Sequence, residues 1–159
     1  MRNFLNERKW LSLFVMNNSL LYLQERIGQS TNLHGLGAVS RWIEGILLAA
    51  EEGHLRVQFT VKEEWLNPAK TFHGGMAATL IDDVMGMTIY SLGNENFFTT
   101  INLQLDYLSF ALVGDVIVVE SKVVRKGVNV IHVEATIHKR HKLLVKASAN
   151  VINSGKMVF

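Results

Sequence analysis

The sequence predicts an α+β fold in which one antiparallel sheet is covered by a single long helix. Two observations predict it. Apolar and polar residues alternate with a period of two in several segments, which is the pattern of half-buried strands. Between these segments, residues 75–91 carry their apolar side chains at helical spacing. Because the turns between the last strands are short, neighbouring strands are expected to be antiparallel, and the helix can cover their apolar face.

Composition narrows the class of protein. The chain has 159 residues, which suits one core, and its net charge of +2 is too small to indicate a nucleic-acid partner by itself. Cysteine is absent, which excludes a disulfide framework and a thiolate metal site. No apolar run reaches the roughly 18–20 residues of a membrane-spanning helix. We therefore expect a cytoplasmic protein without a membrane span.

Residues 1–38 are predicted to form a helical extension before the main domain. One or two amphipathic helices are expected within residues 3–28, and Gly28 with the polar run 29–32 ends them. The apolar side chains expected to pack downward are Phe4, Leu11, Phe14, Leu21 and Leu23. A secretory signal peptide is not favoured, because polar residues follow the apolar run 10–16.

The main domain, residues 39–159, is expected to contain six strands. The first, residues 42–50, is the least regular, and a turn at residues 51–53 joins it to the second, in which Leu55, Val57, Phe59 and Val61 alternate with polar residues. Four more strands follow the helix, at residues 101–107, 116–125, 131–138 and 143–152. Turns at 126–129 and 139–142 connect the last three strands into a meander.

The helix is expected to bury one stripe and to leave a second stripe of small residues open. The buried stripe is Ala77, Leu80, Ile81, Val84, Met87 and Thr88. The open stripe is Gly75, Thr79, Asp82 and Gly86, in which only the carboxylate is large. Such a stripe suits the close approach of a ligand or of a second subunit.

The sequence His73-Gly74-Gly75 stands immediately before this helix. Glycine has no Cβ, so the backbone can approach a ligand closely. The first turn of a helix offers unpaired N–H groups and positive potential, which suit a carbonyl oxygen that gains negative charge under attack. Asp82-Asp83 follow about two helical turns later. A group that polarises an electrophile and a nearby base are what hydrolysis of an activated acyl group needs.

Residues 39–155 resemble the hotdog fold, and within it the acyl-CoA thioesterases of the phenylacetic-acid-degradation type. The resemblance is carried by residues 67–82, in which an acid stands nine positions after His73, by residues 99–108, which contain Tyr107, and by Gly114-Asp115. It implies a curved six-stranded sheet wrapped around a central helix. It also implies a thioesterase that cleaves an acyl-CoA, or an acyl group on a related pantetheine thiol.

The resemblance also implies roles for individual residues. The backbone N–H groups of Gly74 and Gly75 would polarise the thioester carbonyl. Asp82, from the facing subunit, would activate water or attack as a nucleophile. Asn67 and Thr100 would hold the water or the carbonyl, and His73 would orient the site.

Each of these residues also has a structural interpretation. Asp82 could be a solvated helix residue, with Asp83 as a substitute for it. Asn67 precedes Pro68 and could simply open a turn, and His73 could bond neighbouring backbone. Thr100 shares its strand phase with polar neighbours, so it can serve only where that phase faces a pocket or a partner.

Two charged clusters offer weaker predictions. Lys122, Arg125 and Lys126 run into a turn and could contact the phosphates of coenzyme A. His132, Glu134, Thr136 and His138 share one strand face, but a metal site is not favoured without a further ligand. No cofactor is expected, because coenzyme A is part of the substrate and a thioester is already an activated acyl group.

Two alternatives to the thioesterase remain open, and both keep the fold. One is a hotdog dehydratase that acts on 3-hydroxyacyl thioesters, and the other is a non-catalytic acyl-CoA-binding module. We expect a homodimer, or a homotetramer built as a dimer of dimers, with active sites at the subunit interface. Strand edges and the stripe of small residues would otherwise stay uncovered.

Overall fold

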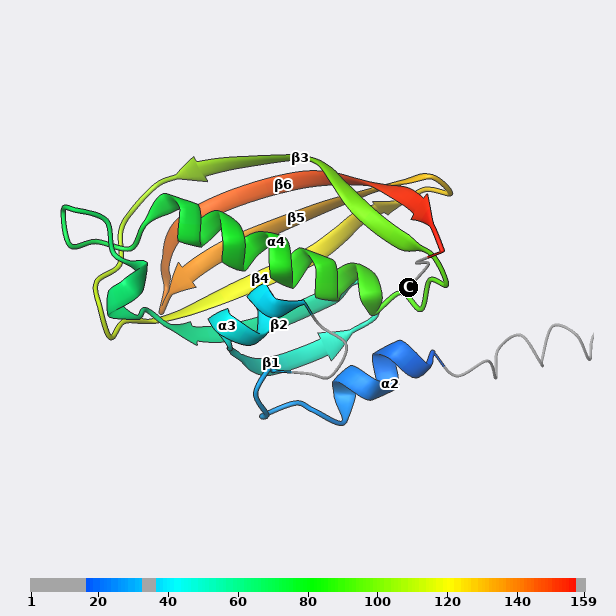
Figure 1. Ribbon diagram of the computed structural model, residues 1–159, viewed down its shortest axis with the longest axis horizontal. Helices are drawn as coiled ribbons and strands as arrows, with labels where there is room; N and C mark the ends of the chain where they lie inside the picture. The colour runs from blue at the N-terminus through cyan, green and yellow to red at the C-terminus, as the bar shows by residue number, and fades with distance from the viewer. Residues whose placement is uncertain (1–16, 33–36, 157–159) are drawn as a thin grey trace, which may run out of the picture.

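A six-stranded antiparallel sheet curves around one long helix in the computed structural model, which describes residues 17–32 and 37–156 (Figure 1). The strands lie in the order β1-β2-β4-β5-β6-β3. Their bounds are β1 Ile46–Glu51, β2 His54–Thr60, β3 Phe97–Tyr107, β4 Val116–Lys126, β5 Val130–Lys139 and β6 Lys142–Gly155. The helix, α4, spans Gly74–Tyr90. The predicted hotdog fold is therefore confirmed.

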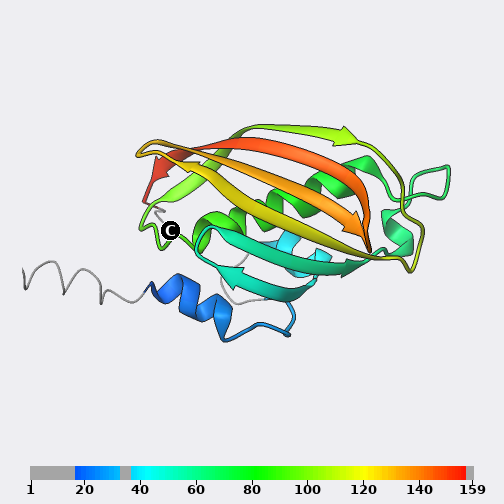
Figure 2. The ribbon, with the colours of Figure 1, turned by 180° about the vertical axis from the view of Figure 1, so that it is seen from behind.

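Helix α4 lies across the concave face of the sheet, and the opposite face is seen from behind in Figure 2. The predicted apolar stripe of α4 is buried throughout: Ala77, Leu80, Ile81, Val84, Met87 and Thr88. These side chains pack against the inward residues of the strands, among them Val57, Ile117 and Val133. This burial fixes the rotation of α4 about its axis, so the stripe that carries Asp82 is turned away from the core.

The first predicted strand is wrong in its N-terminal part. Ala38–Ile43 form a short helix, α3, and β1 begins only at Ile46. Within α3 the buried residues are Ser40 and Ile43, which are three positions apart and so share one helix face. The apolar run fits a strand and a short helix equally well, which explains the error. At Gly45 a Cβ would lie 2.6 Å from the Phe59 ring, so only glycine fits there.

The described part of the N-terminal extension is α2 (Asn18–Gln24) and the segment after it. Leu23 of α2 is buried, whereas Phe4, Leu11 and Phe14 lie outside the described residues. After α2 the chain runs along the outer edge of β1, where Gly28 N–H donates to Leu47 O at 2.7 Å. This segment covers one edge of the sheet. Within the described ranges, β3 is then the edge strand that no other strand pairs on its outer side.

No helix within residues 17–32 or 37–156 combines the length and the apolar character needed to cross a membrane.

Candidate active site

The glycine turn at the start of α4 leaves one backbone donor available. His73 is the N-cap residue, and its Nδ1 accepts a hydrogen bond from Gly75 N–H at 2.8 Å. Gly74 N–H has no hydrogen-bond partner among the described residues. Of the two predicted donors, Gly75 is therefore engaged by His73, and Gly74 is the one that can meet a ligand at the positive end of the helix.

Neighbouring elements fix the position of this turn. His73 N–H donates to Trp65 O, and Trp65 is a fully buried side chain of the short 3₁₀ helix η1 (Glu63–Trp65). Tyr107, the last residue of β3, donates its hydroxyl to Gly74 O at 3.1 Å. A Cβ at Gly74 would lie 3.2 Å from two atoms of the Tyr107 ring. Tyr107 is thus a site residue to which the sequence assigned no role, although it marked the end of the strand.

Asp82 and Thr100 are brought together. The Thr100 hydroxyl donates to Asp82 Oδ1 at 2.9 Å, and both side chains are exposed. The predicted phase of Thr100 is wrong, because the pairing of β3 with β6 shifts between Thr100 and Asn102, which makes Ile101 an extra, bulged residue. Thr100 therefore pairs with the buried Val151 and faces α4, whereas Asn102 faces the other side of the sheet.

Asp83 is held in a different environment from Asp82. The Ser40 hydroxyl of α3 donates to Asp83 Oδ1, and Asp83 Oδ2 is buried without a hydrogen-bond partner among the described residues. Burial raises the pKa of Asp83, the hydrogen bond from Ser40 opposes this rise, and the charge of Asp82 adds to it. Asp83 thus joins α4 to α3, and Asp82 is the exposed carboxylate.

Asn67 organises the loop that precedes the glycine turn. Its Oδ1 accepts from Ala69 N–H at 3.0 Å and from Thr71 N–H at 3.1 Å. Its Nδ2 donates to Thr71 Oγ1 at 2.9 Å, which uses one of the two amide protons. The second amide proton has no acceptor among the described residues.

The basic residues predicted to contact coenzyme A lie away from these groups. In the β4–β5 register, Lys122 lies opposite Glu134 and Arg125 lies opposite His132. A bulge at Val124 puts both cations on the face of the sheet that is turned away from α4. Lys126 pairs with Ile131 at the end of the strand. On the same outer face, His132 Nδ1 bonds Asn150 Oδ1 at 3.0 Å. Among the described residues, no group of three potential metal ligands lies close together.

The available donor and the carboxylate are far apart within one chain. Asp82 lies eight residues after Gly74 on α4. At about 1.5 Å per residue the two backbone positions are separated by about 12 Å along the axis. A reacting atom must lie within about 3 Å of both its oxyanion donor and its base or nucleophile. Within one chain, Gly74 N–H and the Asp82 carboxylate therefore lie too far apart to act on the same reacting atom.

A cavity of about 820 Å³ lies beside the Asp82–Thr100 pair. Its lining includes the apolar side chains Leu23, Met87, Tyr90 and Phe98, together with Asp82 and Thr100. The volume is in the range of small-molecule sites. The Asp82 carboxylate, with the Thr100 hydroxyl bonded to it, therefore lies at the wall of a mostly apolar cavity.

Comparison with known proteins shows the family of the chain. The family model described as the Thioesterase superfamily matches residues 69–146. Human acyl-coenzyme A thioesterase 13 is 30% identical over 81 residues, which are 51% of this chain and 58% of that protein. The match therefore spans little more than half of either chain. The provisionally named esterase PA0474 of Pseudomonas aeruginosa is 30% identical over 95 residues, which are 59% of this chain and 71% of that protein.

Solved structures show the same fold. The PaaI protein of the phenylacetic acid degradation operon of E. coli has a TM-score of 0.76 at 16% identity, over 91% of this chain and 99% of that one. The protein smu.793 of Streptococcus mutans, solved bound to acetyl CoA, has a TM-score of 0.71 at 24% identity, over 79% of this chain and 98% of that one.

Proposed function

Because this chain belongs to the thioesterase superfamily, we propose that it hydrolyses the thioester of an acyl-CoA, or of a related acyl-pantetheine, to a free acid and a thiol. The observation that carries the proposal is the Asp82–Thr100 pair at the wall of the apolar cavity. The unengaged N–H of Gly74 supplies the second element of the chemistry. Relatives named as acyl-CoA thioesterases and a neighbour solved with acetyl CoA support the choice of substrate.

The proposed reaction begins with polarisation of the carbonyl. The thioester oxygen accepts a hydrogen bond from Gly74 N–H, where the dipole of α4 stabilises the negative charge that develops. The Thr100 hydroxyl occupies Asp82 Oδ1, which leaves Oδ2 to take a proton from water. The resulting hydroxide attacks the carbonyl carbon. The tetrahedral intermediate then expels the thiolate, and the proton held by Asp82 returns to the sulfur.

Asp82 could instead attack the carbonyl directly and form a mixed anhydride, which water would then cleave. A single turnover in ¹⁸O-labelled water tests for the anhydride, because label in the protein can come only from that route. Activation of water leaves the enzyme unlabelled. An anhydride that is cleaved at the Asp82 carbonyl puts the label into the protein.

We further propose that each active site is shared between two chains. The separation of about 12 Å along α4 keeps Gly74 and Asp82 of one chain from meeting at one carbonyl. Two copies that pair through the open edge of β3 would set their α4 helices side by side, in opposite directions. The carboxylate of one chain would then face the glycine turn of the other. Lys122 and Arg125 could contact coenzyme A only from a further subunit, because the sheet separates them from their own α4, whereas Lys126 lies at the end of β4.

The alternatives fit the geometry less well. A dehydratase of this fold pairs a histidine with an acid, whereas Nδ1 of His73 is occupied by Gly75 N–H. A module that only binds acyl-CoA has no need of an exposed carboxylate that is oriented by a threonine.

The test is hydrolysis of a panel of acyl-CoA thioesters from acetyl to palmitoyl, with phenylacetyl-CoA included. Released coenzyme A is followed with a thiol reagent, and because the chain has no cysteine the protein itself gives no signal. We expect thiol release that Asp82→Asn abolishes. Binding of acyl-CoA without release would instead identify a binding module. Dehydration of a 3-hydroxyacyl-CoA with the thioester left intact would identify a dehydratase.

A further inference from the structure

The cavity beside Asp82 extends along α4 toward the N-terminal extension. Its lining includes Gly86 and Tyr90 of α4 and Tyr22 of α2. Gly86 and Tyr90 follow Asp82 by one and two helical turns, so they lie about 6 and 12 Å further along the axis. Asn17, which caps α2, donates its Nδ2 to Ser91 O at the end of α4. Tyr22 therefore belongs to the end of the cavity that is remote from the Gly74 turn.

We propose that this cavity holds the acyl group of the substrate, and that Gly86 and Tyr22 determine which acyl lengths it accepts. The proposal rests on the thioesterase function above. The occupant follows from the lining, because an acyl carbon bound to a carbonyl at Asp82 must continue into an adjoining apolar space. The volume of about 820 Å³ is much more than an acetyl group fills, which favours a longer aliphatic or aryl-substituted chain.

Gly86 is the first determinant. A glycine inside a helix is less stable than an alanine, so its presence within a 17-residue helix, more than one turn from either end, needs a reason. Packing within the described part of the chain gives none, because a Cβ at Gly86 would have no atom of those residues within 4 Å. Gly86 lies on the face of Asp82 and lines the cavity. We infer that the missing side chain leaves the path of the acyl group open.

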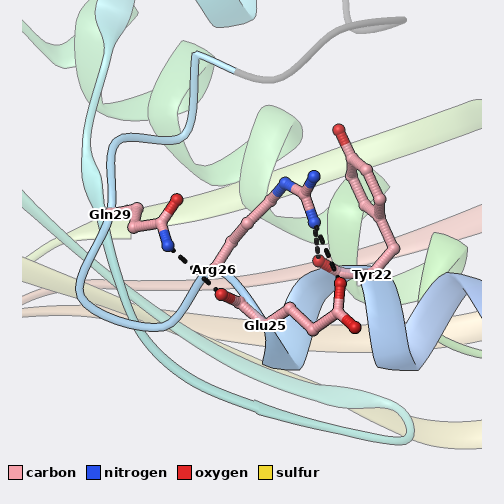
Figure 3. Close-up of polar contacts among 4 residues, drawn as sticks. All are labelled: Tyr22, Glu25, Arg26 and Gln29. Carbon is pink, nitrogen blue, oxygen red and sulfur yellow. Dashed lines mark hydrogen bonds and ion pairs between the residues drawn. The ribbon is translucent and has the colours of Figure 1, made fainter.

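Tyr22 is the second determinant, and the end of α2 holds it in place. The Arg26 guanidinium lies 3.6 Å from the centre of the Tyr22 ring, an attractive cation–π contact. Nη1 of Arg26 also donates to Tyr22 O at 2.8 Å and lies 3.7 Å from Glu25 Oε2 (Figure 3). Next to Tyr22, Leu23 is buried in the core. The N-terminal extension thus contributes a fixed aromatic wall rather than a loose cover.

The experiment compares two variants at each position. The readout is the ratio of kcat/KM for decanoyl-CoA to kcat/KM for acetyl-CoA. We expect Gly86→Leu to lower this ratio at least about 10-fold, the smallest usual effect of one methylene in an apolar pocket. Gly86→Ala, which fills little of the space, should change it much less. Tyr22→Ala should raise the relative rate of the longest thioesters, whereas Tyr22→Phe should keep the wild-type profile.

Failure of this proposal is distinguishable from failure of the proposed function. Absence of hydrolysis for every thioester would reject the function. In that case the cavity is still tested by calorimetry, where Gly86→Leu should abolish the tighter binding of decanoyl-CoA over free coenzyme A. An unchanged chain-length profile in Gly86→Leu, or unchanged binding preference, would overturn the assignment. If the same variant altered the oligomeric state with an unchanged profile, Gly86 would be a subunit contact, and the proposal would likewise be overturned.

Discussion

Replacing Gly74 by proline removes the proposed donor while keeping the start of α4. Gly74 is the first residue of the helix, a position that proline favours because its fixed φ suits the first turn. The residue before it, His73, has φ −69° and ψ 132°, which is the extended conformation that a following proline requires. Since Gly74 N–H has no partner among the described residues, its loss should break no hydrogen bond of the fold.

The expected loss can be separated into two parts. Loss of one oxyanion donor lowers kcat by about 10²–10³, which corresponds to about 2.7–4 kcal/mol in the transition state. Both Gly74→Pro and Gly74→Ala add a Cβ that would lie 3.2 Å from the Tyr107 ring, so this crowding is common to them. Only proline removes the N–H. The ratio of the two variants therefore isolates the hydrogen bond from the crowding.

The assay is kcat from thiol release at saturating acyl-CoA, together with thermal unfolding of each variant. We expect Gly74→Pro to be about 100-fold or more slower than Gly74→Ala, with melting temperatures that differ by only a few degrees. Equal kcat values for the two variants would show that Gly74 N–H does not stabilise the transition state. The oxyanion assignment would then be wrong.

Three further predictions follow from the same geometry. Asp82→Asn should lower kcat by about 10²–10⁴, the usual effect of a positioned base, while Asp83→Asn should change kcat far less; the opposite order in a side-by-side assay would exchange their roles. Equal mixtures of Asp82→Asn and Gly74→Pro chains, after subunit exchange, should regain about a quarter of wild-type activity, since half the dimers would carry one intact site; no recovery would place each site within one chain. Burial raises the pKa of Asp83 in the folded state above its ordinary value of 3.8, so the folded state keeps this proton to a higher pH than the unfolded state does. The free energy of unfolding of the wild type should therefore fall as the pH rises from 3.8 through the raised pKa. Asp83→Asn should lack that fall, so its free energy of unfolding in urea, relative to wild type, should increase between pH 4 and pH 7. If the two proteins showed the same dependence of stability on pH, the raised pKa of Asp83 would be refuted.

Local patterns predicted the elements whose burial decides their structure. The alternation in β2 and the apolar stripe of α4 both depend on one face meeting one core, so the sequence alone located Leu55, Val57, Leu80 and Val84 inside. Thr100 was misplaced because a single bulge at Ile101 exchanges the faces of a strand, and a bulge has no periodic signal. The engagement of Gly75 N–H by His73 depends on a side-chain rotamer, which spacing does not encode. Helix α3 was missed because six residues are too few to show a helical period.

The order of strands also determines when the chain can fold during its synthesis. Strand β2 pairs with β4, and β3 pairs with β6, the last of the described strands to emerge from the ribosome. Helix α4 packs mainly on β4 and β5, both of which follow it in the chain. Each early element thus waits for a partner made later, and only the hairpins β1–β2, β4–β5 and β5–β6 can close from neighbouring sequence. Until β4 and β5 are made, the apolar face of α4 stays exposed to other nascent chains and to chaperones, and until β6 is complete both edges of β3 stay unpaired.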